Sequence, residues 1–156
     1  MLSRMTRTDS ASRMIRADAP TLYRAFVDRD ALLAWLPPQG MRATFHSFDA
    51  RVGGGYRMSL HYEKPPSGGG KSTADTDVVD VEFVELVPNQ RVVQRITFES
   101  KDPSFADVMT MTWSLAPTEG GTEVRVVAEN VPSGISKEDH DEGLRSSLDK
   151  LAKYVE

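Results

Sequence analysis

The sequence contains no cysteine, which excludes disulfides, thiolate nucleophiles and zinc sites with cysteine ligands. It also lacks an excess of positive charge, since 19 Lys and Arg stand against 23 Asp and Glu. Most non-specific nucleic-acid affinity depends on such an excess, so we expect no nucleic-acid partner. No apolar run approaches the ~20 residues of a membrane span, and the first residues contain no signal-peptide core. These absences predict a cytoplasmic protein without a membrane span.

The chain has 156 residues, of which 39% are hydrophobic. This size and composition suffice for one compact domain with a real core. The first residues mix Arg with Ser and Thr and show no hydrophobic periodicity. We therefore interpret residues 1–13 as a flexible N-terminal tail and residues 14–156 as a single domain.

Two short helices are predicted near the N-terminus. Asp18 stands ahead of Pro20 as a cap and start signal for the first. Asp30 is the expected start of the second, which Pro37 and Pro38 end. Isolated helices of this length are marginal in water, so both need a sheet to rest on.

Strand signals fill the middle of the chain. Six apolar or alternating segments are separated by turn residues, at 41–50, 55–63, 77–86, 91–100, 107–116 and 122–130. The short connections leave no room for crossover helices, so neighbouring strands should pair antiparallel. The alternation predicts a sheet with one apolar face, which would be formed by Tyr56, Met58, Leu60, Tyr62, Val79, Val81, Phe83, Met109, Met111, Trp113 and Leu115.

A long C-terminal helix should cover that face. Ser136 opens a capping-box pattern, and acidic residues come early and Lys late, as the helix dipole favours. At 1.5 Å per residue the helix would run about 30 Å, long enough to cross the sheet. Its apolar stripe consists of Leu144, Leu148, Leu151 and Val155. Together these elements predict an α+β helix-grip fold: a curved antiparallel sheet wrapped around a long C-terminal helix, with two short helices after the first strand.

Five segments resemble a known family, in order and at suitable distances: AFVDRDALLAWLPP, FDARVGGGYRMSL, ELVPNQRVV, GGTEVRVVAENVP and GLRSSLDKLAKYVE. They are similar to bacterial proteins related to the C-terminal domain of the activator of Hsp90 ATPase, within the START and Bet v 1-like (SRPBCC) superfamily. The resemblance covers about residues 14–155. It implies the helix-grip fold and a cavity between the sheet and the last helix. One departure is that Leu144 follows Gly143, where such proteins often carry Trp, which would change the local pocket volume.

Two glycine-rich segments match nucleotide-binding motifs only in part. In PPSGGGKST, the residues Gly70, Lys71 and Ser72 match the end of a phosphate-binding loop, but Pro65 stands where the first glycine is required. A strand follows, whereas that motif needs a helix N-terminus, so we interpret the segment as a flexible hairpin loop. RVGGGYR has Met58 in place of its third motif glycine and is interpreted as a turn that uses positive φ angles.

No metal, cofactor or catalytic set is predicted. His46, His61 and His140 could meet in principle, but His61 points away from the apolar face, which favours solvated or hydrogen-bonded histidines. The acidic run EDHDEG is explained by the helix dipole. No secure inward carboxylate was found beside the tyrosines, as a general acid and base pair would need.

The sequence therefore predicts binding of a small hydrophobic ligand, a lipid or an aromatic, between the sheet and the C-terminal helix. Methionine adapts to variable apolar shapes, which favours a pocket, although the same residues could form plain core. The alternatives are a cyclase-like or hydrolytic enzyme that uses the same cavity and a chaperone-associated interaction module, the latter by analogy alone. Formation of a homodimer is a further alternative. The predicted ligand-binding residues are Trp35, placed near the entrance with the two short helices, and Tyr56, Met58, Leu60, Phe83, Met109, Met111, Trp113, Leu144 and Leu148.

Overall fold

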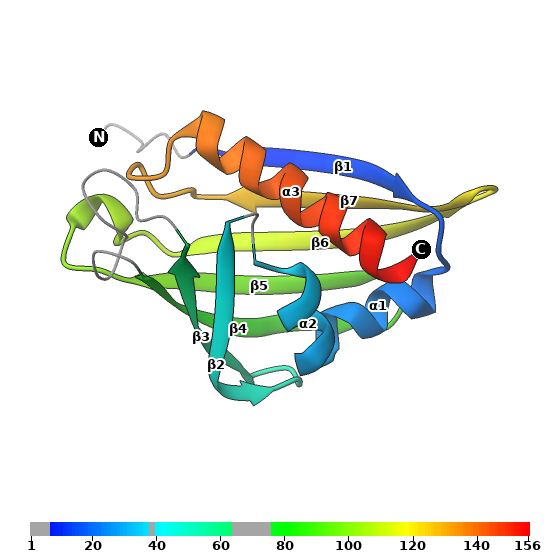
Figure 1. The fold of residues 1–156 in the computed structure, drawn as a ribbon, viewed down its shortest axis with the longest axis horizontal. Helices are drawn as coiled ribbons and strands as arrows, with labels where there is room; N and C mark the ends of the chain where they lie inside the picture. The colour runs from blue at the N-terminus through cyan, green and yellow to red at the C-terminus, as the bar shows by residue number, and fades with distance from the viewer. Residues whose placement is uncertain (1–6, 38–39, 64–75) are drawn as a thin grey trace, which may run out of the picture.

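The computed structural model describes residues 7–37, 40–63 and 76–156, which form a seven-stranded antiparallel sheet with helices on one face (Figure 1). The spatial order is β1-β7-β6-β5-β4-β3-β2, so only β1 and β7 pair without being adjacent in sequence. This is the predicted helix-grip architecture.

The strands are β1 (Asp9–Ile15), β2 (Met41–Asp49), β3 (Gly55–Tyr62), β4 (Thr76–Val87), β5 (Arg91–Glu99), β6 (Met109–Thr118) and β7 (Gly121–Glu129). The helices are α1 (Ala19–Val27), α2 (Arg29–Trp35), the 3-10 turn η1 (Pro103–Phe105) and α3 (Lys137–Val155).

Residues 9–13, which the sequence places in the N-terminal tail, belong to a strand. Asp9–Ile15 form β1, which pairs with β7 in the register Asp9↔Ala128 to Ile15↔Thr122. Only Asp9 and Ile15 of this strand are buried, and the polar residues between them hid the strand from a search for alternation. Backbone pairing along β7 outweighs the weak pattern of the segment itself.

The helix starts follow their capping residues. Asp18 accepts a hydrogen bond from the Thr21 backbone N–H at 2.9 Å, as predicted. The second helix begins at Arg29 rather than Asp30, because the Asp28 side chain accepts from the backbone N–H groups of Asp30 and Ala31. It ends at Trp35, before Pro37. Among the helices in the described ranges, none is long and apolar enough to cross a membrane.

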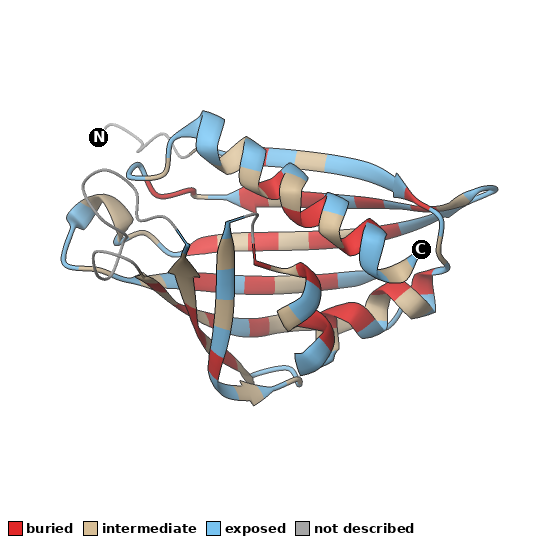
Figure 2. Ribbon diagram, in the orientation of Figure 1, coloured by how far each residue is buried: buried red, intermediate tan, exposed pale blue. Residues whose placement is uncertain are grey.

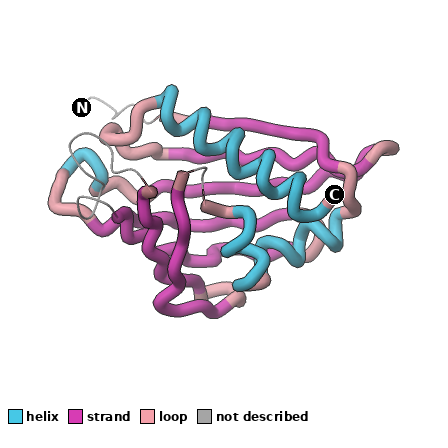
Figure 3. The backbone as a smooth tube through the Cα atoms, viewed as in Figure 1, coloured by secondary structure: helices cyan, strands magenta, loops and turns pink. Residues whose placement is uncertain are grey.

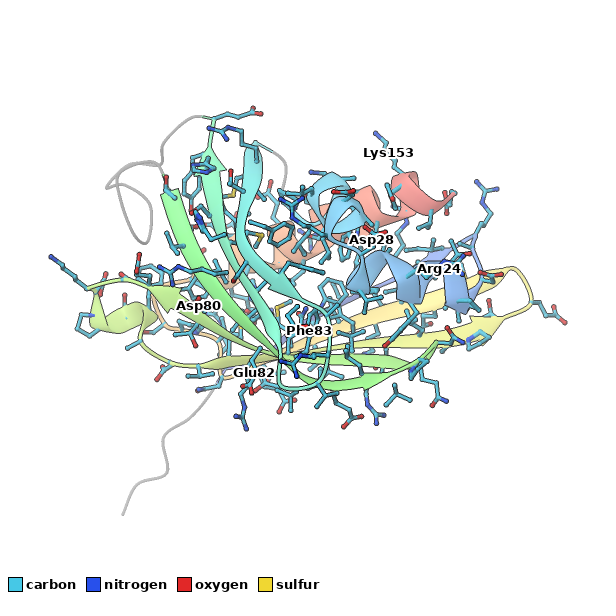
Figure 4. All side chains as sticks on the ribbon, turned by 90° about the horizontal axis from the view of Figure 1, so that it is seen from below. Arg24, Asp28, Asp80, Glu82, Phe83 and Lys153 are labelled. Atoms are coloured by element: carbon cyan, nitrogen blue, oxygen red, sulfur yellow. The ribbon has the colours of Figure 1, made fainter. Side chains whose placement is uncertain are left out.

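The sheet curves strongly toward the helices. β2, β3 and β4 rise out of the plane of the other strands (Figure 4), and the tube in Figure 3 shows α1, α2 and α3 lying over the same face of the sheet. Bulges interrupt the register of β2 between Phe45 and Ser47 and that of β4 between Phe83 and Glu85. A bulge bends its strand and increases the local twist, so these two account for part of the curvature.

The RVGGGYR segment is the β2–β3 turn, as predicted, but its glycines have different roles. Gly53 has a φ of 84°, a left-handed conformation that favours glycine. Gly55 is needed for close packing instead, because a Cβ there would lie 1.9 Å from the Val81 carbonyl oxygen. The PPSGGGKST segment, with Gly70, Lys71 and Ser72, falls in residues 64–75, outside the described residues.

One end of the space between sheet and helices is filled by an aromatic cluster of Phe26, Trp35 and Trp113, called the plug below. The ring centroids lie 5.0 to 5.6 Å apart, and the Phe26–Trp35 and Trp35–Trp113 pairs meet edge to face. The Trp35 indole N–H donates to the Ala25 carbonyl oxygen at 2.9 Å, so its polar atom is satisfied inside the core.

Helix α3 starts at the cap Ser136, as predicted, and buries the side that faces the sheet (Figure 2). Leu144, Leu148 and Leu151 are buried as predicted, while Val155 is only partly buried. The α3 backbone packs most extensively against β1, then against α2 and α1. Within the described ranges, β3, β4 and β5 have no comparable packing with it.

The N-terminal turns of α3 are attached to β1 through Asp9, whose side chain is fully buried. Its Oδ2 lies 2.7 Å from His140 Nδ1 and accepts from Arg7 Nε at 3.1 Å, and Lys137 Nζ lies 3.7 Å from Oδ1. Burial alone would raise the pKa of Asp9, but the bonds and charges of His140 and Arg7 outweigh it and lower that pKa.

Replacing Leu151 by Ala should lower the free energy of unfolding by ~2–5 kcal/mol, the range for truncating a buried leucine. Leu151 is fully buried. Lys153 on the same helix projects outward and is exposed (Figure 4), and Lys153→Ala should change stability by less than about 0.5 kcal/mol. Urea titration of both variants measures the difference. Equal losses in both would contradict the packing described for α3.

Asp9→Asn should destabilise the protein by ~1–3 kcal/mol at neutral pH, because the buried charged hydrogen bonds lose their acceptor charge. A lowered folded pKa contributes stability above the unfolded value of about 3.9, and that contribution is lost as pH falls through the folded pKa. The gap between wild type and variant should therefore narrow below about pH 4. Asp149→Asn, at the exposed Arg13 pair, is the matched control with a small effect. A gap that stays constant down to pH 3 would contradict this assignment.

Candidate ligand-binding cavity

A cavity of about 1250 Å³ lies between the concave face of the sheet and the N-terminal half of α3. It is lined by side chains of β3, β4, β5 and β6 on one side and of α3 on the other. Ligand pockets for small molecules commonly measure ~300–1,000 Å³, so the space is large enough for a lipid-sized or aromatic guest. Its apolar wall consists of Leu36, Met41, Met58, Leu60, Val79, Val81, Ile96, Phe98, Phe105, Met109, Met111, Ile135 and Leu144.

The cavity stays open partly because α3 carries small residues where it crosses. Gly143 lines the space, and a Cβ there would meet no atom within 4 Å. Leu144 lines it as well. Ser147 is the last lining residue of α3, and its hydroxyl donates to the Leu36 carbonyl oxygen at 3.1 Å.

Seven of the ten predicted ligand-binding residues line this cavity: Tyr56, Met58, Leu60, Met109, Met111, Trp113 and Leu144. The other three, Trp35, Phe83 and Leu148, are packed into the core with at most 1% exposure and do not reach it. Trp35 is therefore not near an entrance, because the rings of the plug surround it. Of the two short helical segments, only Leu36, directly after α2, contributes to the lining.

The exposed lining residues mark where the cavity meets solvent. They come from the β5–β6 connection and the start of α3, and comprise Glu99, Lys101, Asp102, Gly134, Ser136 and Asp139. This is the end opposite the plug, as Figure 1 shows by the separation of η1 and the start of α3 from α1. The entrance therefore lies at the β5–β6 connection rather than beside α1 and α2.

Near the plug, the buried side chain of Gln94 forms hydrogen bonds with two partners. Gln94 is 4% exposed, accepts from the Trp113 indole N–H at 3.3 Å and donates to the Tyr56 hydroxyl oxygen at 3.5 Å. Burial raises the pKa of Tyr56, partly offset by the bond from Gln94. Tyr56 therefore stays a neutral phenol at this depth.

Near the entrance, Tyr62 and Asp77 form a second polar pair. The Tyr62 hydroxyl donates to Asp77 Oδ2 at 2.5 Å. Burial raises the pKa of Tyr62, and the bond to Asp77 and the charges of Asp77 and Asp139 raise it further. Tyr62 of β3 and Asp139 of α3 both line the cavity, so strand and helix contribute polar groups to this end.

His140 lines the same end of the cavity and is held by Asp9 through Nδ1. It is a hydrogen-bonded histidine, as the sequence favoured. His46 and His61 bond elsewhere, to Ser59 Oγ at 2.7 Å and to Thr44 Oγ1 at 3.3 Å. Within the described ranges, no group of three potential ligands could hold a metal ion.

Sequence reasoning missed two carboxylates here. Asp77 shares the alternation of Val79 and Val81, so its inward direction was readable from parity alone, yet a charged residue at an inward position was not considered. Asp9 was placed in the tail, and no local signal could have paired it with His140, 131 positions away.

A shallower hollow of about 680 Å³ adjoins the β2–β3 turn and outward side chains of β3, β4 and β5. Its charged groups pair with one another: Arg57 donates to Asp80 and Glu99 at 2.8 Å each, and Arg95 lies 3.7 Å from Glu82. Figure 4 places Asp80 and Glu82 on β4, with Phe83 beside them. Exposed pairs of this kind contribute little stability and leave little unmatched charge.

Known proteins share this fold over nearly their whole length. Protein CV1439 from Chromobacterium violaceum is 32% identical, with a TM-score of 0.80 and coverage of 96% of this chain and 97% of that chain. Protein Mll3558 from Rhizobium loti is 26% identical, with a TM-score of 0.70 and coverage of 96% and 97%. The AHSA1-like protein from Aeromonas hydrophila is 16% identical, with a TM-score of 0.70 and coverage of 96% and 92%, and shows the fold alone. A search among curated proteins finds no match.

Residues 16–156 match the family described as Activator of Hsp90 ATPase homolog 1-like protein, which spans every element of the fold after β1. The match agrees with the five segments that resemble this family and with the helix-grip architecture. The chain therefore belongs to the Activator of Hsp90 ATPase homolog 1-like family.

Proposed function

We propose that this protein binds one small, largely apolar molecule in the cavity between the sheet and α3. The observation that carries the proposal is the contrast within the interior. The plug is closely packed, whereas about 1250 Å³ beside it is lined by apolar side chains and left unfilled. Apolar surface that faces an open cavity gains free energy when a guest covers it.

The lining chemistry supports a guest of variable shape. Met58, Met109 and Met111 lie on two separate strands and face the same space. Methionine has an unbranched, polarizable side chain that adjusts to different apolar surfaces at low cost. Membership of the family is compatible with either ligand binding or an interaction role, and the cavity favours the former.

The interaction-module alternative would need an apolar patch outside the cavity. In the described ranges, the exposed large apolar side chains are Met14, Val52, Val108 and Tyr154. They come from four separate segments: β1, the β2–β3 turn, the residue before β6, and the end of α3. Exposed apolar residues in such small number are normal on globular domains and do not by themselves mark an interface. The enzymatic alternative would depend on Tyr56, Tyr62 and His140 in the same cavity.

Ligand entry should change the fluorescence of Trp113 and not that of Trp35. Only Trp113 lines the cavity, while Trp35 is enclosed by the plug. With decanol as the first probe, followed by fatty acids, sterols and aromatics, we expect a saturable response with one molecule per chain. Trp35→Phe should retain this response and Trp113→Phe should lose most of it. A flat response across the whole panel would refute the proposed function.

Met111→Trp should weaken binding of the same probe by filling the cavity. Because the added volume enters open space, the loss in unfolding free energy should stay below about 1 kcal/mol, whereas overpacking a solid core costs ~1–3 kcal/mol. Thr112→Trp is the matched control, since its side chain points to the other face of β6 and should leave binding unchanged. Two results would contradict this prediction: unchanged affinity of Met111→Trp for the probe, or severe destabilisation of the variant. Either would show that the interior is closed beside Met111.

A further inference from the structure

The cavity is polar at one end only, and this asymmetry bears on the kind of guest. At the plug end, Gln94 binds Tyr56 and Trp113, so the polar groups there satisfy one another. At the entrance end, side chains from three elements converge, namely Tyr62 of β3, Asp77 of β4, and Asp139 and His140 of α3. A guest with one polar and one apolar end would match this arrangement.

Two groups at the entrance present hydrogen-bond acceptors. Tyr62 donates its only O–H to Asp77, which leaves the lone pairs of its oxygen as acceptors. A carboxylate such as Asp139 accepts only. A head group that donates hydrogen bonds therefore finds partners here.

The charges at the entrance end also favour a head group that is not anionic. Among the described residues that line the cavity, Asp77, Asp102 and Asp139 carry carboxylates and Lys101 carries a positive charge, while Glu99 is already paired with Arg57. Asp139 of α3 and Tyr62 of β3 line this end of the cavity together. An anionic head group placed between Tyr62 and Asp139 would meet the negative charge of Asp139. The surroundings are partly desolvated, so the repulsion between the two negative charges is stronger than in water.

We infer that the guest is an amphiphile whose polar end is a hydrogen-bond donor, a hydroxyl or an ammonium group, held between Tyr62 and Asp139 at the entrance. Its apolar end lies against Met111 and Trp113. This inference rests on the proposed function and adds the chemistry of the head group to it.

The test uses three ligands with the same ten-carbon chain: decanol, decylammonium and decanoate. Their affinities are measured on the full chain at about pH 7.5, where decanoate is fully ionised, by the Trp113 fluorescence change and by calorimetry. Decanol and decylammonium should bind about tenfold or more tightly than decanoate, since one lost charged contact or hydrogen bond is of that order.

Two variants locate the selectivity. Tyr62→Phe removes one acceptor without touching Asp9 or His140 and should reduce the preference for decanol over decanoate several-fold. Asp139→Lys replaces an exposed carboxylate by a cation and should raise decanoate affinity while decanol affinity stays nearly constant. Tyr154→Phe, at an exposed tyrosine on α3, is the control and should change none of the three affinities.

The possible results distinguish a failure of the head-group inference from a failure of the proposed function. Equal binding of all three ligands, or tightest binding of decanoate, would overturn the head-group inference while the proposed function stands. Selectivity that persists unchanged in both Tyr62→Phe and Asp139→Lys would overturn the assignment to this end of the cavity. Absence of binding by any of the three, and by the wider panel, would overturn the proposed function itself.

Discussion

The attachment of α3 to β1 at its start and to the α2 segment in its C-terminal half is the constraint on which the rest of the structure depends. Its start is attached to β1 through the buried Asp9 carboxylate, which meets His140 and Lys137. Its C-terminal half rests on the α2 segment, where Lys150 Nζ donates to the Pro37 carbonyl oxygen at 2.5 Å. Between these attachments the sheet curves, and the helix bridges a space that its own side chains do not fill.

The plug explains why this space is closed at one end. Edge-to-face aromatic packing fills volume densely and leaves the indole of Trp35 hydrogen-bonded inside the core. Beyond Trp113 the inward side chains become methionine, leucine and valine, and the facing helix presents Gly143 and Leu144. The change from rigid aromatic to smaller and more flexible side chains coincides with the change from packed core to cavity.

Buried polar groups in this interior follow a consistent rule. Gln94 is satisfied on both sides by Tyr56 and Trp113, so it orders the inner wall at little cost in free energy. At the entrance, the Tyr62 hydroxyl donates to the buried Asp77 carboxylate. In both places a buried polar group is paired with another polar side chain, which offsets the cost of taking it out of water.

The sequence by itself determined the element order, the antiparallel sheet, the C-terminal helix from Ser136 and the inward rows of β3 and β6. These features depend on local caps and on alternation, which are readable from a single chain. The same parity would have identified Asp77 as an inward residue. Only the tertiary structure decided that residues 9–13 form a strand, that Trp35 belongs to the plug and that His140 meets Asp9. These outcomes depend on which distant segments pack together: β1 pairs with β7, Trp35 meets Trp113, and Asp9 lies 131 positions from His140. Periodicity shows which way a side chain points and carries no information about what it meets there.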